Sequence, residues 1–167
     1  MRAIAATAIF CAFGVTGATA SSASTVPRCK GAQLKISASL QGATQSLLGT
    51  AVLSNPSAHA CALPVAPSRV TLVIGTQVLP ALTVRMSAEG VPTRQLAGHG
   101  RVIVGIQWRN WCGAPRGNVH VRLGVTIYSS ETRRPSVGLV RTPVCVDPKH
   151  SSRVAVSRFI EWRPFHR

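Results

Sequence analysis

The most informative pattern in this sequence is the alternation of apolar and polar residues over positions 119–127. The apolar set is Val119, Val121, Leu123, Val125 and Ile127. His120, Arg122, Thr126 and Tyr128 fall on the opposite face. Because successive side chains of a β-strand point to opposite faces, this pattern predicts a strand with one buried and one solvated face. No run of helical spacing follows residue 20, so the sequence predicts an all-β protein.

Shorter segments of the same kind recur between Gly, Pro and Asn residues. The other predicted strands span residues 34–40, 47–53, 69–74, 78–84, 102–108, 137–146 and 154–160. Gly75-Thr76-Gln77 predicts a hairpin, and Pro80 predicts that the strand after it is an edge strand or contains a bulge. Residues 86–100 are predicted to form a loop. About eight short strands with such turns favour an immunoglobulin-like two-sheet sandwich.

The N-terminus has the organisation of a secretory signal peptide. Arg2 precedes an apolar run over residues 3–15, and Ala18-Thr19-Ala20 supplies a cleavage site. The alternative is an uncleaved membrane anchor, but the stretch is built largely from Ala, Thr and Gly. We therefore expect a signal peptide at 1–20, a disordered mature N-terminus at 21–28, the sandwich domain at 29–160 and a C-terminal tail at 161–167. The protein is expected to be secreted or associated with the cell envelope.

Four cysteines remain after cleavage: Cys29, Cys61, Cys112 and Cys145. An even number in an exported chain predicts two disulfides, and four cysteines allow three pairings. We favour Cys29–Cys61 with Cys112–Cys145, because each bond would join segments that could be neighbours in a meander. The sequence contains no ligand spacing typical of zinc, so no metal or cofactor is expected.

The chain is strongly basic, with 19 Lys and Arg against 4 Asp and Glu. Removing Arg2 with the signal peptide leaves a net charge of +14. Such an excess favours anionic partners, here a cell-wall polymer or a membrane surface. The alternative is a compositional bias, since 16 of the basic residues are Arg in a chain rich in Ala, Gly and Val. The charges are scattered singly, which argues against a nucleic-acid arm.

Groups for catalysis are scarce. The only carboxylates are Glu89, Glu131, Asp147 and Glu161, and no serine-hydrolase or metalloprotease motif occurs. We predict that the protein is not an enzyme. A hydrolase would instead require a cleft that holds one of these carboxylates beside a His or Ser.

Two clusters are candidate binding residues. The first combines Trp111 with Arg109 and Arg116, as an aromatic platform for sugar or lipid; the alternative is an indole packed over a disulfide. The second lies in the C-terminal segment and combines aromatic and basic side chains, which suits an anionic surface. Its members are Arg158, Trp162 and Arg163. The alternative there is a last strand followed by a frayed tail.

The cysteine framework resembles an exported actinobacterial family, domain of unknown function 4232. The similarity covers residues 28–159 and rests on Cys29, the Leu-Ser-Asn-Pro turn at 53–56, Cys61-Ala62-Leu63-Pro64, the segment 108–113 and Pro143-Val144-Cys145. Ala66-Pro67 stands where that family has Gly-x-Pro. The resemblance implies an immunoglobulin-like sandwich outside the cytoplasm, and it implies no reaction.

These features together predict an exported, non-catalytic binding or structural domain of the cell envelope. A different class, a secreted effector or inhibitor that binds another protein, would require a contiguous exposed apolar patch.

Overall fold

A computed structural model describes residues 26–43 and 45–163 of the chain. The predicted signal peptide, most of the segment 21–28 and the last four residues of the predicted tail lie outside the described residues. Within the described part, no helix is long and apolar enough to cross a membrane.

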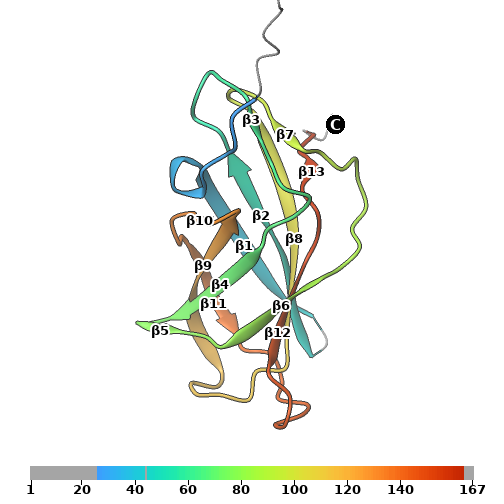
Figure 1. The fold of residues 1–167 in the computed structure, drawn as a ribbon. Helices are drawn as coiled ribbons and strands as arrows, with labels where there is room; N and C mark the ends of the chain where they lie inside the picture. The colour runs from blue at the N-terminus through green and yellow to red at the C-terminus, as the bar shows by residue number, and fades with distance from the viewer. Residues whose placement is uncertain (1–25, 44, 164–167) are drawn as a thin grey trace, which may run out of the picture.

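Two β-sheets pack face to face and form a sandwich (Figure 1). The first sheet contains, in spatial order, β1 (Lys35–Ala43), β2 (Ser46–Ser54), β8 (Arg101–Arg109), β12 (Ser152–Val156) and β6 (Ala81–Arg85), with β13 (Ile160–Glu161) also paired to β8. The second contains β10 (Ser130–Glu131), β9 (Asn118–Ile127), β4 (Arg69–Ile74) and β5 (Gln77–Val78), with β11 (Ser136–Arg141) also paired to β9. A separate short pair is formed by β3 (Cys61–Ala62) and β7 (Gln95–Leu96), and Gly31–Gln33 forms a 3-10 turn. All strand pairs are antiparallel except β6 with β12. The predicted two-sheet all-β fold is confirmed.

The alternating segments supply the core. Every second residue of β9, from Val119 to Ile127, is buried, and the same holds for Val102 to Trp108 in β8. Trp108 is fully buried, and its indole N–H donates to Ser152 Oγ at 2.7 Å. A buried indole N–H needs such a partner, because an unpaired donor in the core is costly.

Four predicted elements differ from the observed ones. The strand predicted over 154–160 is divided, since β12 ends at Val156 and β13 begins at Ile160. Residues 78–84 do not form one strand, because the chain crosses at Leu79-Pro80 from β5 in one sheet to β6 at the edge of the other. The hairpin before it is present, and Gly75 takes the left-handed conformation (φ 57°) that glycine adopts without strain. The strand predicted over 137–146 ends at Arg141, before Pro143, and the loop 86–100 contains β7.

The predicted disulfides, Cys29–Cys61 and Cys112–Cys145, are both formed. Such bonds persist in oxidising compartments, so the folded chain belongs outside the reducing cytosol. The first bond lies with β3 at one end of the sandwich (Figure 1). The second joins the β8–β9 connection to the β11–β12 connection at the opposite end.

Candidate functional site

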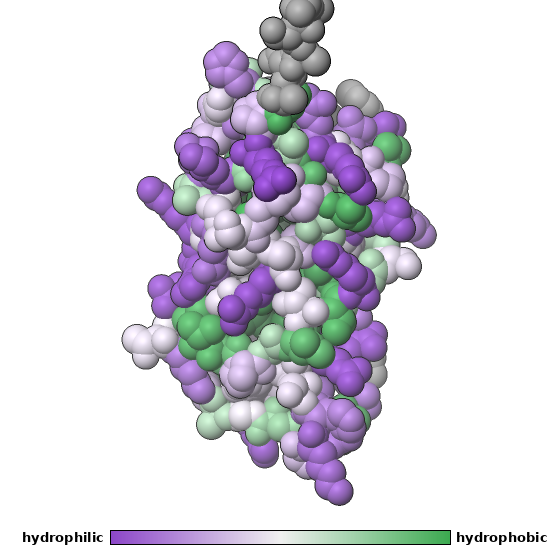
Figure 2. Space-filling model, in the orientation of Figure 1, coloured by the Kyte–Doolittle hydropathy of each residue, from purple (hydrophilic) through white to green (hydrophobic). Residues whose placement is uncertain are grey.

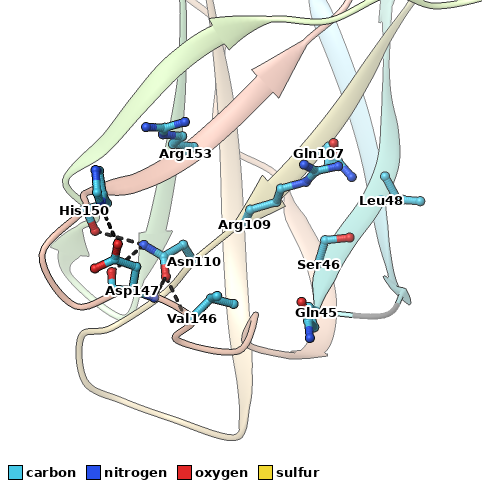
Figure 3. Close-up of a pocket in the computed structure, with 10 residues that line it drawn as sticks. All are labelled: Gln45, Ser46, Leu48, Gln107, Arg109, Asn110, Val146, Asp147, His150 and Arg153. Atoms are coloured by element: carbon cyan, nitrogen blue, oxygen red, sulfur yellow. Dashed lines mark hydrogen bonds and ion pairs between the residues drawn. The ribbon is translucent and has the colours of Figure 1, made fainter.

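An open cleft of about 830 Å³ lies beside the second disulfide (Figure 3). Its floor is the outer face of the first sheet, where β2, β8 and β12 run side by side. Its wall is the loop that follows Cys145. The lining residues are Gln45, Ser46, Leu48, Gln107, Arg109, Asn110, Val146, Asp147, His150 and Arg153. Most of the lining residues are therefore polar, two of them are arginines, and Leu48 and Val146 add apolar surface.

Two arginines stand next to each other on the floor of the cleft. Arg109 ends β8, Arg153 lies in β12, and the strand register places them directly opposite each other. Both are exposed, and neither guanidinium has a hydrogen-bond or ion-pair partner among the described residues. In Figure 3 the Arg109 side chain reaches toward Gln107, whereas Arg153 lies on the His150 side. Like charges at directly opposite positions destabilise a sheet, so this pair is unfavourable in the free protein.

The wall of the cleft is held by Asn110. Its side-chain N–H₂ donates to the carbonyls of Asp147 and His150, both at 2.9 Å. Its Oδ1 accepts from the backbone N–H groups of Val146 and Asp147, also at 2.9 Å. Asn110 has a φ of 56°, a left-handed conformation that Asn tolerates better than most residues. One side chain thus ties the end of β8 to the loop across the disulfide.

Asp147 and His150 form the only carboxylate–imidazole pair among the described residues. Asp147 Oδ2 lies 2.5 Å from His150 Nδ1, and Asp147 Oδ1 accepts from the Lys149 backbone N–H at 2.9 Å. These contacts, the Lys149 N–H first, hold the pKa of Asp147 below its ordinary value of 3.8. Both side chains remain open to water, with exposed fractions of 62% for His150 and 45% for Asp147.

The predicted cluster around Trp111 is separated by the fold. Trp111 is only 4% exposed, lies 5.9 Å from Trp108 between ring centroids, and donates its indole N–H to Pro115 O at 3.1 Å. It therefore packs beside the disulfide and is not an exposed platform. Of its predicted neighbours, Arg109 lines the cleft, while Arg116 is exposed outside the cleft lining.

The C-terminal candidates do not reach the cleft. Arg163 is paired with Glu161 at 3.0 Å, and Trp162 is stacked under Arg101 at 5.1 Å. Arg101 and Arg109 are the two ends of β8, about 27 Å apart at the rise of an antiparallel strand. Arg158 borders a different hollow, beside Arg85. The structure therefore places these three residues away from Arg109.

Sequence reasoning missed most of the cleft. Of the lining residues it selected only Arg109 as a binding residue; those it did not select are Gln45, Ser46, Leu48, Gln107, Asn110, Val146, Asp147, His150 and Arg153. Arg153 occupies a polar position in the alternating run Ser152–Val156, which was a usable signal for exposure. The sequence could not predict that Arg153 lies opposite Arg109, because the register between two distant strands depends on the loops that connect them.

The cleft can hold an anion through its arginines, and it also places a carboxylate beside a histidine, as a hydrolase would require. No serine, threonine or cysteine side chain hydrogen-bonds to His150 within the described residues. No family model, curated protein or solved structure matches the chain. The resemblance to the exported actinobacterial family therefore stays a prediction.

Proposed function

We propose that this chain is an exported, non-catalytic binding domain of the cell envelope, retained there by attraction to anionic wall or membrane components. The observation that carries the proposal is the cleft with two arginines that have no side-chain partner in the described part of the chain, set in a protein of strong positive charge. The disulfides support the compartment, since they require oxidising conditions.

The surface charge is largely uncompensated. Within the described residues, the ion pairs of arginine are those of Arg134 with Glu131 and Arg163 with Glu161. Asp147 is paired with His150, so three of the four carboxylates are already engaged inside the protein. The other arginines and the lysines of the described residues have no carboxylate partner, so their charge can attract a polyanion.

A protein-binding effector is less well supported. The face in Figure 2 shows apolar patches separated by polar and charged side chains. Among the large exposed apolar residues, Leu48 and Val146 both line the cleft, while Leu82 and Leu139 lie in different sheets. A partner protein of ordinary size would require one contiguous patch.

Binding of the oxidised protein to isolated wall polymer and to anionic vesicles, across a salt series, tests the proposal. We expect retention by at least one envelope fraction that weakens as salt rises, because exposed charges are screened over about 8 Å at physiological ionic strength. Absence of binding to every envelope fraction at low salt would contradict the proposal.

A second function, ester hydrolysis, is favoured by the Asp147–His150 pair. Asp147 fixes the ring so that Nε2 is free to accept a proton from water. The exposure of both groups argues against it, because water weakens the electrostatic stabilisation of a transition state. Hydrolysis of chromogenic phosphate or carboxylate esters that is lost in His150→Gln would establish this function. Equal rates for the protein and the variant would exclude it.

A further inference from the structure

The floor of the cleft carries two arginines at directly opposite positions. Arg109 and Arg153 belong to adjacent antiparallel strands, and opposite residues on such strands have Cβ atoms about 4.5–5.5 Å apart. In Figure 3 the two side chains then extend in different directions, Arg109 toward Gln107 and Arg153 toward the His150 side, so their charges repel each other across the space between them. Neither is neutralised by a carboxylate of the described residues. A bound anion of two charges would remove the repulsion and use both guanidinium groups.

We propose that Arg109 and Arg153 form a binding site for the phosphate group of a phosphate monoester. This inference rests on the proposed function and specifies the group that the cleft takes. A phosphate monoester carries a charge of about −1.5 to −2 at neutral pH and three acceptor oxygens. Guanidinium groups bind such oxygens in a bidentate manner, so one monoester can engage both arginines. A phosphate diester or a carboxylate carries one charge and leaves one arginine uncompensated.

The neighbours of the pair support the same group. Gln107 is two residues before Arg109 in β8, so its amide lies on the same face and adds a donor. The carboxylate of Asp147 would repel a phosphate, but its oxygens are already engaged by the Lys149 N–H and by His150. Its charge is thereby partly offset at the cleft wall.

The rim of the cleft fits the organic part of an ester. Leu48 and Val146 line the cleft and are 45% and 64% exposed, which is high for large apolar side chains (Figure 3). They can pack against a hydrocarbon or ring attached to the phosphate, and such contact removes apolar surface from water. The cleft therefore favours a monoester with an apolar substituent over inorganic phosphate.

Binding of phenyl phosphate and diphenyl phosphate to the oxidised protein at pH 8, followed by NMR and calorimetry, tests the site. We expect the monoester to bind about tenfold more tightly than the diester, since an added charge-assisted contact is worth roughly 1.5 kcal/mol or more. Arg109→Gln and Arg153→Gln are each expected to weaken monoester binding about tenfold for the same reason. Arg153→Lys keeps the charge and should retain part of the affinity.

Arg141→Gln is the matched control. Arg141 is an exposed arginine of β11 in the other sheet, so its replacement removes the same charge without touching the cleft. We expect this variant to bind phenyl phosphate as the unmodified protein does. Equal weakening by Arg141→Gln, or equal affinity for the two esters, would overturn the proposal.

Vesicles distinguish the source of the phosphate and separate this inference from the proposed function. One set contains phosphatidic acid, a lipid monoester, and the other contains phosphatidylglycerol, a lipid diester, in a phosphatidylcholine background. A preference for phosphatidic acid that Arg153→Gln removes would assign the site to a lipid. Phenyl phosphate binding without that preference would assign it to a soluble or polymer-borne monoester. Envelope binding that Arg109→Gln and Arg141→Gln reduce equally would refute the site and leave the proposed function intact.

Discussion

Each end of the sandwich is closed by one disulfide and by one asparagine that holds a loop. At the first end, Asn55 donates to the carbonyls of His59 and Ala97 and accepts from the Ser57 N–H. At the second end, Asn110 makes the corresponding contacts with the loop after Cys145. The two ends therefore use the same structural device to satisfy the backbone groups of a turn.

The two ends differ in whether their arginines contact another side chain. At the first end, Arg28 stacks on the Tyr128 ring at 5.0 Å, which gives the guanidinium a partner. At the second end, Arg109 and Arg153 lie opposite each other on the cleft floor, and neither guanidinium contacts a partner among residues 26–43 and 45–163. A binding site commonly retains local interactions that are unfavourable until the ligand arrives. This difference supports the proposal that the second end is the binding end.

The largest expected effect concerns the two disulfides. They span 32 and 33 residues, so the entropic contribution of each is about 3.7 kcal/mol in the loop-closure treatment. We expect Cys29→Ser with Cys61→Ser, and Cys112→Ser with Cys145→Ser, to lower the free energy of unfolding by similar amounts in urea titrations. Only the second pair of substitutions should also weaken phenyl phosphate binding. Equal loss of binding in both variants would mean that the cleft depends on general stability.

Substitution by glycine should change the free energy of unfolding differently at Asn55 and at Asn110. Replacing either with Ala removes contacts to three or four backbone groups and should cost about 2–3 kcal/mol. Asn110 has a positive φ and Asn55 does not, so Asn110→Gly should be about 1 kcal/mol more stable than Asn110→Ala. Asn55→Gly should gain nothing over Asn55→Ala. Denaturant unfolding of the four variants checks this, and the same ranking at both positions would contradict it.

The sequence predicted the strands better than the site, for a physical reason. The alternation over 119–127 is a local pattern, and it predicted β9 and its buried face correctly. The alternation over 102–108 predicted β8 equally well. The cleft arises from register between β8 and β12, which are more than 40 residues apart. Nothing local to Arg153 indicates that Arg109 lies opposite it.

For a related reason, the sequence predicted the burial of only one of the two neighbouring tryptophans. Trp108 continues the apolar face of its strand, so the alternating pattern predicts that it is buried. Trp111 lies beyond the end of the strand, where the two-residue alternation no longer predicts which side chains are buried. The left-handed conformation of Asn110 turns the chain so that Trp111 packs near Trp108. The crossing at Pro80 is similar, because proline predicts an irregularity and does not specify a change of sheet.

Removing one cation at each end should move stability in opposite directions. Arg153→Gln relieves a like-charge pair and should raise the free energy of unfolding by about 0.5 kcal/mol at low salt. Arg28→Gln removes the contact with Tyr128 and should lower it by about 0.5 kcal/mol. The gain from Arg153→Gln should shrink at high salt through screening. Urea titrations at two salt concentrations check this, and a loss of stability in both variants would refute the like-charge interpretation.

The smallest expected effect is a local response to acid at the second end alone. The Lys149 N–H donates to Asp147 Oδ1 at 2.9 Å, and at the first end the Ser57 N–H donates to Asn55 Oδ1 at 3.0 Å. The pKa of Asp147 is lowered below 3.8 in the folded protein, so the stabilising contact is complete above that value and is lost as the pH falls through the lower folded value. The amide group of Asn55 does not titrate.

We therefore expect the Lys149 amide resonance to shift below about pH 4 while the Ser57 resonance stays unchanged, in NMR spectra recorded from pH 6 to pH 2.5. Asp147→Asn keeps the acceptor and should remove the shift, because the turn at the second end would then use the same uncharged group as the turn at the first. A Lys149 shift that persists in Asp147→Asn would assign the acid response to another group.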